Sequence, residues 1–315
     1  MSGVMQFIRH CGKLVLVAVL FVLVIFKGHS QNIQEYKVID NGGAGTHKAM
    51  AAKDLLFPDF TVYRPKDLDF AVSKTTLPLV VFGNGACFNT SLPFERYLNE
   101  IASFGYIIVA IGPYQDSINE LTDSLAFKFT YPDKLLEAID RMTVAANDPA
   151  SEYYRKVDLD HIAVMGQSCG GLQALAVSGD HRVTTTVCLN SAVIDPNSNR
   201  DGRIKDLVVG KEVLETLHSP ILYLIGGPSD IAYDNALDDF SRIGHVFVSM
   251  ASLDVGHGGT YREKFGGSFA TVTLQWLEWQ LKGHQWAGEI FLGEECICTF
   301  PGWTMNSKNY EKLSN

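Results

Sequence analysis

The stretch formed by residues 161–172 restricts the fold more than any other part of the chain. A short apolar run at residues 162–165 leads directly into Gly-Gln-Ser-Cys-Gly, centred on Ser168, and an alanine-rich helical pattern follows at residues 171–177. Strand, sharp turn and helix in this order, with glycine two positions before and after the serine, are the pattern of a nucleophile elbow. The glycines let neighbouring backbone approach so tight a turn. The pattern predicts an exposed Ser168 hydroxyl above a helix N-terminus, whose partial positive charge favours a developing oxyanion.

Apolar runs of strand length alternate with helical patterns along the rest of the chain. The predicted strands lie at residues 60–65, 77–82, 105–111, 162–165, 184–189, 220–225 and 245–250, and the predicted helices at residues 94–104, 132–147, 171–177, 232–243 and 265–282. Strands that are apolar throughout suit a parallel sheet buried on both faces. With 46% hydrophobic residues the chain can fill such a core. We therefore expect a single α/β domain with a doubly wound, mostly parallel sheet and helices on both faces.

The N-terminal residues predict export. Arg9 and Lys13 flank the start of an uninterrupted apolar run at residues 14–26, which is as long as the apolar part of a signal peptide and shorter than a membrane span of roughly 20 residues. We expect a signal peptide over residues 1–30 and a mature domain over residues 31–315. An uncleaved membrane anchor is the alternative. In both cases the domain lies outside the cytoplasm, as a secreted or periplasmic protein.

Cysteine usage permits disulfides but does not give their connectivity. Of the six cysteines, Cys11 lies in the predicted signal segment, and the others are Cys87, Cys169, Cys188, Cys296 and Cys298. Their odd number leaves at least one thiol that is free or paired between molecules. We expect the C-terminal tail, residues 283–315, to wrap back onto the domain, with a disulfide as one means of holding it. The Cys-Ile-Cys segment of this tail lacks the second ligand pair of a zinc site, so we expect no metal.

Loops after three predicted strands carry Ser168, Asp230 and His257, in that order. In a parallel sheet, the loops after the carboxyl ends of the strands meet at one edge. His257 lies between two glycines and suits a general base that later acts as an acid, because imidazole titrates near neutral pH. Asp230 would accept a hydrogen bond from the imidazole and orient it. The sequence therefore predicts a catalytic triad.

Each of these assignments has an alternative, which for His257 is an ordinary solvated loop histidine. A non-catalytic interpretation makes Ser168 and Asp230 N-caps of the helices that follow them. Other carboxylates near the predicted strand ends compete for the role of the acid, the first of them as the main rival: Asp195, Asp234 and Asp254.

The order serine, acid, histidine resembles that of the α/β-hydrolase superfamily. Val-Phe-Gly-Asn-Gly-Ala at residues 81–86, Gly-Gln-Ser-Cys-Gly-Gly at residues 166–171 and Gly-Gly-Pro-Ser-Asp at residues 226–230 resemble secreted esterases of the cutinase-like and polyester hydrolase, dienelactone hydrolase-like and chlorophyllase-like groups. The resemblance covers about residues 60–282. It implies an α/β-hydrolase fold, no cofactor, and a serine carboxylic-ester hydrolase that forms an acyl-enzyme on Ser168. An acyltransferase with the same triad and a catalytically silent binding scaffold are the alternatives.

The resemblance also implies an oxyanion hole made of two backbone N–H groups. One belongs to Cys169, and the other to the loop after the strand at residues 77–82, where Ala86 is the first choice and Cys87 the second. Polyester hydrolases carry a bulkier residue where this chain has Cys169 and an aromatic residue where it has Ala86. Both differences argue against a polymer-binding platform here. Because Cys87 and Cys169 should lie side by side, we expect two buried thiols that pack as small apolar groups, with a disulfide that stiffens the site as the alternative.

Charge limits the classes of partner. The formal net charge of -9 argues against a nucleic-acid-binding surface. We expect a small-molecule or polymeric ester as the substrate and no nucleic-acid partner, with membrane attachment only if the N-terminal segment is retained. Acyl-chain length and oligomeric state do not follow from the sequence.

Overall fold

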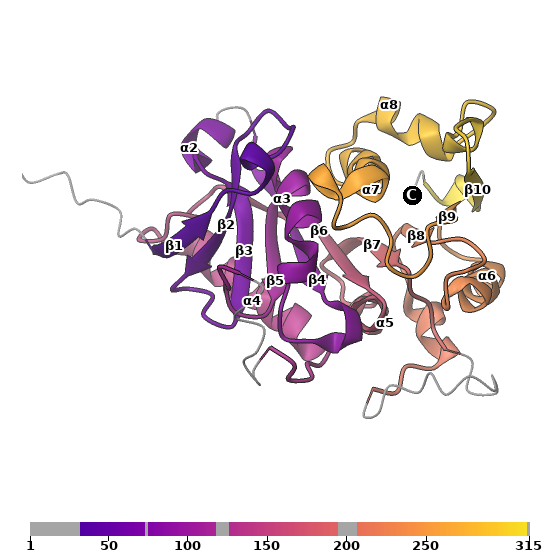
Figure 1. The fold of residues 1–315 in the computed structure, drawn as a ribbon, viewed down its shortest axis with the longest axis horizontal. Coiled ribbons are helices and arrows are strands. Elements are labelled where there is room, and N and C mark those ends of the chain that lie inside the picture. Colours follow the sequence, from indigo (N-terminus) through magenta and orange to yellow (C-terminus); the bar gives the residue numbers. More distant parts are fainter. Residues whose placement is uncertain (1–31, 73–74, 118–125, 195–206, 314–315) are drawn as a thin grey trace, which may run out of the picture.

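The computed structural model describes residues 32–72, 75–117, 126–194 and 207–313 (Figure 1). The strands are β1 Ile33–Lys37, β2 Ala49–Asp54, β3 Phe60–Pro65, β4 Leu77–Gly83, β5 Ile107–Ile111, β6 Val157–Gln167, β7 Val183–Leu189, β8 Ile221–Ile225, β9 Val248–Leu253 and β10 Trp303–Lys308. The α-helices are α2 Leu68–Ala71, α3 Glu95–Ser103, α4 Asp133–Asn147, α5 Cys169–Val177, α6 Tyr233–Arg242, α7 Gly267–Gln280 and α8 Gln285–Gly288. The predicted signal segment lies outside the described residues.

These strands form one sheet, in the order β1-β2-β3-β5-β4-β6-β7-β8-β9-β10. Neighbouring strands from β5 to β9 are parallel, and β1, β2, β3 and β10 join the two edges in antiparallel pairs. The predicted α/β class with a mostly parallel sheet is therefore confirmed. From β4 the chain passes to β5 on one side and then to β6 on the other, so the direction of winding reverses between β4 and β6. In open parallel sheets, ligands bind beyond the carboxyl ends of the strands at such a reversal.

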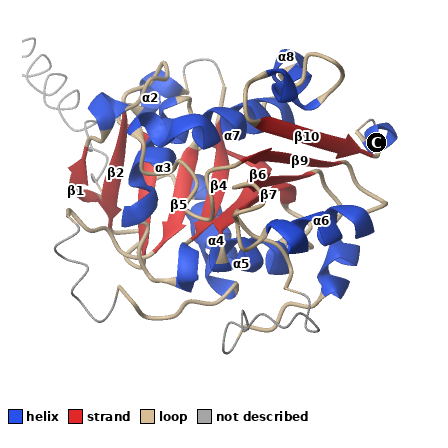
Figure 2. Ribbon diagram, turned by 45° about the vertical axis from the view of Figure 1, so that its right-hand side comes forward, coloured by secondary structure: helices blue, strands red, loops and turns tan. Residues whose placement is uncertain are grey.

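Helices cover both faces of the sheet (Figure 2). Helices α3 and α7 pack on one face, and α4, α5 and α6 pack on the other. Alternate residues of β4 enter different cores, because Val80 and Phe82 pack with α3 and α7 whereas Leu79 and Val81 pack with α4. A strand buried on both faces has to be apolar throughout, which explains the continuous apolar runs of the sequence.

Three strands were absent from the predicted pattern, namely β1, β2 and β10. Strand β1 lies at the edge and is mostly exposed, so it carries no apolar run. Strand β2 has the sequence Ala-Met-Ala-Ala-Lys-Asp, and alanine and aspartate are uncommon in strands. Pairing with β1 and β3 outweighs this low strand propensity. The predicted strand at residues 245–250 is shifted along the chain, because β9 spans Val248–Leu253.

The C-terminal tail returns to the sheet, where β10 pairs with β9 along its whole length. Buried Phe291 packs against Trp276 and Trp279 of α7. The disulfide of the tail joins Cys296 to Cys298, two residues apart, so the idea that a disulfide ties the tail to the domain is wrong. Strand pairing and aromatic packing hold the tail instead.

Two observations bear on the compartment. The disulfides Cys87–Cys169 and Cys296–Cys298 indicate an oxidising environment, and Cys188 is a buried free thiol. Within the described residues, the helices are too short or too polar to cross a bilayer.

Candidate active site

Ser168 lies at the turn between β6 and α5, with Gln167 ending the strand and Cys169 beginning the helix. Its φ of 53° and ψ of -120° are unfavourable for a residue with a side chain. The Ser168 N–H donates to the carbonyl of Leu189 in β7 at 2.9 Å, which holds the turn against the sheet. The serine is half-buried, while Cys169 beside it is buried. The strained elbow that the sequence predicts is therefore present.

The elbow depends on backbone-to-backbone contact at Gly166 and Gly170. A Cβ atom on Gly170 would lie 2.1 Å from the carbonyl carbon of Gly83 at the end of β4, and one on Gly166 would lie 2.1 Å from the carbonyl oxygen of Gly170. Both distances are impossible for real atoms, so glycine is required at each position. This contact brings the loop after β4 against the start of α5.

The structure brings Ser168, His257 and Asp230 into one chain of hydrogen bonds. His257 Nε2 lies 2.9 Å from Ser168 Oγ, and His257 Nδ1 lies 2.7 Å from Asp230 Oδ1. Asp230 follows β8 and His257 follows β9, so parallel strands place all three groups at the same edge of the sheet. Because an ionised carboxylate only accepts, Nδ1 carries the proton and Nε2 is left to accept the proton of Ser168.

Asp230 is a buried carboxylate surrounded by donors. Besides His257, it accepts the N–H groups of Gly226 and Ala232, each at 3.0 Å, and the Nδ2 group of Asn190 at 2.6 Å. Burial raises the pKa of the carboxyl, but these four hydrogen bonds together outweigh it and hold the pKa below its usual value. Asp230 is therefore ionised beside the imidazole and can stabilise its protonated form.

Asn190 is a member of this network that the sequence did not single out. It is buried at the end of β7, with a φ of 42°, and its Nδ2 group also lies 3.2 Å from the carbonyl of Gly256. Its Oδ1 accepts from the hydroxyl of Tyr261. Asn190 thereby ties the carboxylate of Asp230 to the loop that carries His257. A lone asparagine at a strand end carries no sequence signal of such a role.

The rival acids do not reach His257 within the described part of the chain. Asp254 accepts from the hydroxyl of Ser229 at 2.7 Å, and Asp234 lies in the first turn of α6. Asp195 lies outside the described residues. Asp230 is thus the carboxylate that is hydrogen-bonded to the imidazole of His257.

The loop after β4 ends in a single 3-10 turn, Gly85–Cys87. The N–H of Cys87 donates to the carbonyl of Asn84 at 3.1 Å, so it is occupied within the turn. Ala86 is exposed and has a φ of 54°. Of the two residues predicted as the donor in this loop, Ala86 is therefore the better candidate.

Cys87 and Cys169 form a disulfide, with their Cα atoms 5.1 Å apart. The expectation of two free, buried thiols is therefore wrong. The close contact of Gly83 with Gly170 brings the two loops near enough for the bond, which chain distance conceals because the cysteines are 82 positions apart. The bond ties the residue after Ser168 to the residue after Ala86, and it removes Cys169 as a competing nucleophile.

A hollow of about 370 Å³ adjoins the triad. Its lining includes Gln167 from the elbow, Phe94 from the turn before α3, and Gly258 and Tyr261 from the loop that follows His257. Gln167 donates from Nε2 to the carbonyl of His257 at 3.0 Å and so fixes the position of that loop. Across the described residues, there is no cluster of three or more His, Cys, Asp or Glu side chains that could hold a metal ion.

Comparison of the sequence with models of known protein families and with curated proteins finds no match. What the site does is therefore inferred from its geometry.

Replacing Gly170 with alanine should disrupt the elbow, because the new Cβ would overlap the backbone of Gly83. We expect Gly170→Ala to lower the free energy of unfolding by about 3 kcal/mol or more, measured by urea denaturation. Gly258→Ala is the matched control, because a Cβ there meets no atom within 4 Å. Equal stability of the two variants would contradict the backbone contact.

Replacing Asn190 with alanine should raise the pKa of Asp230, because one of the hydrogen bonds that lower it is lost. A carboxylate with a lowered pKa stabilises the folded state above its unfolded pKa, and this contribution disappears as the pH falls through the folded pKa. Asn190→Ala should therefore lose more stability at pH 7 than near pH 3. Asn147→Ala, which removes an exposed amide of α4, is the control. A loss of stability independent of pH would show that Asn190 acts only by packing.

Proposed function

We propose that the protein is a secreted serine hydrolase of the α/β-hydrolase type that cleaves a carboxylic ester through an acyl-enzyme on Ser168. The observation that carries the proposal is the unbroken hydrogen-bonded chain from Ser168 through His257 to buried Asp230. The placement of all three groups at the carboxyl edge of the sheet, with the serine at the reversal of winding, supports the α/β-hydrolase type. The two disulfides support an extracytoplasmic location.

In the first half of the reaction, His257 Nε2 takes the proton of Ser168 as Oγ attacks the ester carbonyl. The carbonyl oxygen becomes an oxyanion, which the N–H groups of Ala86 and Cys169 would stabilise. The imidazolium, held by Asp230, then gives its proton to the leaving alcohol, and the acyl group stays on Ser168.

In the second half, His257 deprotonates a water molecule, which attacks the acyl-enzyme. The imidazolium then returns this proton to Ser168 Oγ as the acyl–Oγ bond breaks and the carboxylic acid is released. The side chain of His257 is 30% exposed, so water can reach the imidazole. This access favours hydrolysis over transfer to another acceptor. The complete hydrogen-bond chain argues against a silent scaffold, since such a scaffold has no need of a base aligned on a serine hydroxyl.

A fluorophosphonate probe should label the folded protein on Ser168, and p-nitrophenyl esters of graded chain length should be hydrolysed. Ser168→Ala should abolish labelling and lower kcat by about 10⁴-fold or more. Ser241→Ala, an exposed serine on α6, should leave both unchanged. Labelling that persists in Ser168→Ala, or a folded protein that is neither labelled nor active, would contradict the proposal.

The Cys87–Cys169 disulfide should affect both stability and rate. It closes a loop of 82 positions, so the double variant Cys87→Ser, Cys169→Ser should lose up to about 4 kcal/mol of unfolding free energy. We also expect kcat to fall by about tenfold or more, because the two oxyanion donors lose their fixed separation.

The double variant Cys296→Ser, Cys298→Ser is the matched control, because that bond spans only two positions and belongs to the C-terminal tail. It should change kcat little. If the two double variants had the same kcat at a temperature where both are folded, the disulfide at the site would have no role in catalysis.

A further inference from the structure

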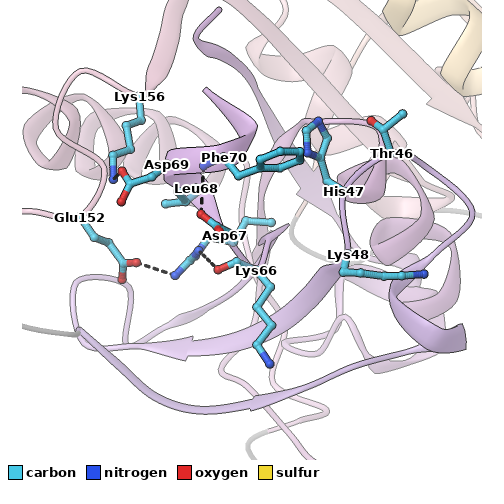
Figure 3. A pocket seen from close by; sticks show the side chains of 11 residues that line it. Thr46, His47, Lys48, Lys66, Asp67, Leu68, Asp69, Phe70, Glu152 and Lys156 are labelled. Atoms are coloured by element: carbon cyan, nitrogen blue, oxygen red, sulfur yellow. Dashed lines mark hydrogen bonds and ion pairs between the residues drawn. The ribbon is translucent and has the colours of Figure 1, made fainter. Parts of the chain in front are cut away.

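The hollow beside the triad is smaller than another one, of about 850 Å³, which has Phe70 and Lys156 in its wall (Figure 3). Lys156 precedes β6, whereas Ser168 follows it, so the length of the strand separates the larger hollow from the triad. The smaller hollow, in contrast, is directly connected to the triad through Tyr261, which lines it and also belongs to the hydrogen-bond network around Asp230.

Tyr261 is held firmly in its place. The residue is 2% exposed, and its ring packs edge-to-face against Phe94, Tyr97 and Phe269, with centroids 5.3, 5.2 and 5.6 Å away. Its hydroxyl donates to Oδ1 of Asn190. Because the ring is enclosed by three others, the direction of this hydrogen bond is fixed by the packing.

The loop that carries His257 folds over this hydrogen bond at Gly259. A Cβ atom there would lie 2.5 Å from the ring of Tyr261 and 3.1 Å from Oδ1 of Asn190, and the φ of Gly259 is 53°. A side chain at this position would push the loop away from both groups. The catalytic loop therefore lies directly on the contact between Tyr261 and Asn190.

The side-chain amide of Asn190 uses its full hydrogen-bonding capacity. Its Nδ2 group donates to Oδ2 of Asp230 at 2.6 Å and faces the carbonyl of Gly256 at 3.2 Å. Both partners only accept, so they keep Nδ2 on their side and turn Oδ1 towards Tyr261. Since Asn190 is fully buried, the loss of the Tyr261 hydroxyl would leave Oδ1 without a donor, which is costly.

The hydroxyl of Tyr261 acts on the carboxylate of Asp230 through this amide. A donor on the amide oxygen polarises the amide and strengthens the hydrogen bond that Nδ2 donates, because hydrogen bonds in a chain reinforce one another. A carboxylate that is better compensated by such donors is a weaker acceptor for the Nδ1–H of His257. The strength of the bond between Asp230 and His257 therefore depends on Tyr261.

Of the titratable groups that face Tyr261, only one is charged. They are Tyr97 of α3, Cys188 of β7 and Asp230. Burial raises the pKa values of Tyr261, Tyr97 and Cys188 above their ordinary range, so these three groups stay neutral. The ionised carboxylate of Asp230 is thus the charge on which the hydroxyl acts.

We propose that Tyr261 is a positioning residue of the triad, which acts through Asn190 to compensate the carboxylate of Asp230 and so to set its hold on His257. The assignment rests on the proposed hydrolase function. It extends the hydrogen-bonded chain from three residues to five, in the order Ser168, His257, Asp230, Asn190 and Tyr261.

Two conservative variants separate this role from packing. Tyr261→Phe keeps the ring and removes only the hydroxyl. Tyr97→Phe is the matched control, because it removes another buried hydroxyl, which donates to Thr273 Oγ1 at 2.8 Å, from a ring that packs against Tyr261. Both variants should lower the Tm to a similar extent, since each loses one buried hydrogen bond.

The first measurement is the NMR resonance of the His257 Nδ1–H in the full chain carrying Ser168→Ala, which needs no esterase activity. Tyr261→Phe should move this resonance further downfield, because a less compensated carboxylate accepts more strongly. Asn190→Ala should move it more in the same direction, and adding Tyr261→Phe to Asn190→Ala should have no further effect. Tyr97→Phe should leave the resonance in place.

The second measurement is the pH profile of ester hydrolysis by the chain with Ser168 intact. Tyr261→Phe should lower kcat by about fivefold and change KM little, because the aromatic wall of the hollow is kept. The acid limb of the profile should move to higher pH by roughly 0.3 pH unit, since a less compensated carboxylate favours the protonated imidazole. Tyr97→Phe should change neither quantity.

Three results would overturn the proposal. One is an Nδ1–H resonance and a pH profile that are unchanged in Tyr261→Phe. Equal changes in Tyr97→Phe would show that packing alone is responsible, and an undiminished effect of Tyr261→Phe in the Asn190→Ala chain would show that the hydroxyl does not act through Asn190. A wild-type chain that hydrolyses no ester would contradict the proposed function instead, and the NMR comparison would still decide the role of Tyr261.

Discussion

The contact between the backbone of Gly83 and that of Gly170 is the constraint on which the rest of the site depends. It joins the end of β4 to the start of α5 at the place where the winding of the sheet reverses. Because both residues at this contact are glycines, the loop that carries Ala86 comes close enough to the elbow for Cys87 to form a disulfide with Cys169. The disulfide and the position of the loop that carries Ala86, the proposed oxyanion donor, thus both depend on one close approach.

The second half of the site rests on a buried carboxylate. Asp230 is held by backbone N–H groups and by Asn190, so its ionised form is stabilised before any substrate arrives. Asn190 links it through Tyr261 to the histidine loop, and Gln167 links the same loop to the elbow. These contacts fix the imidazole between its two partners, which is the arrangement that acyl transfer requires.

Local patterns predict the elbow and the central strands, because each depends on residues that are near one another in the chain. The triad joins residues that are distant in the chain, and its prediction depends instead on loops that follow parallel strands at the same end of the sheet. The edge strands β1, β2 and β10 were missed, since exposed or alanine-rich segments obtain their structure from their neighbours. The role of Asn190 and the Cys87–Cys169 bond depend on how strand ends meet, which spacing does not reveal.

The most direct test of the account is a crystal structure of the protein after reaction with a phosphonate ester that mimics the tetrahedral intermediate. The account predicts phosphorus bonded to Ser168 Oγ and a phosphonyl oxygen within about 3 Å of the backbone nitrogens of both Ala86 and Cys169. His257 Nε2 should stay within hydrogen-bonding distance of Ser168 Oγ or of the leaving-group oxygen. Phosphorus bonded to another residue, or a phosphonyl oxygen directed away from both N–H groups, would contradict it.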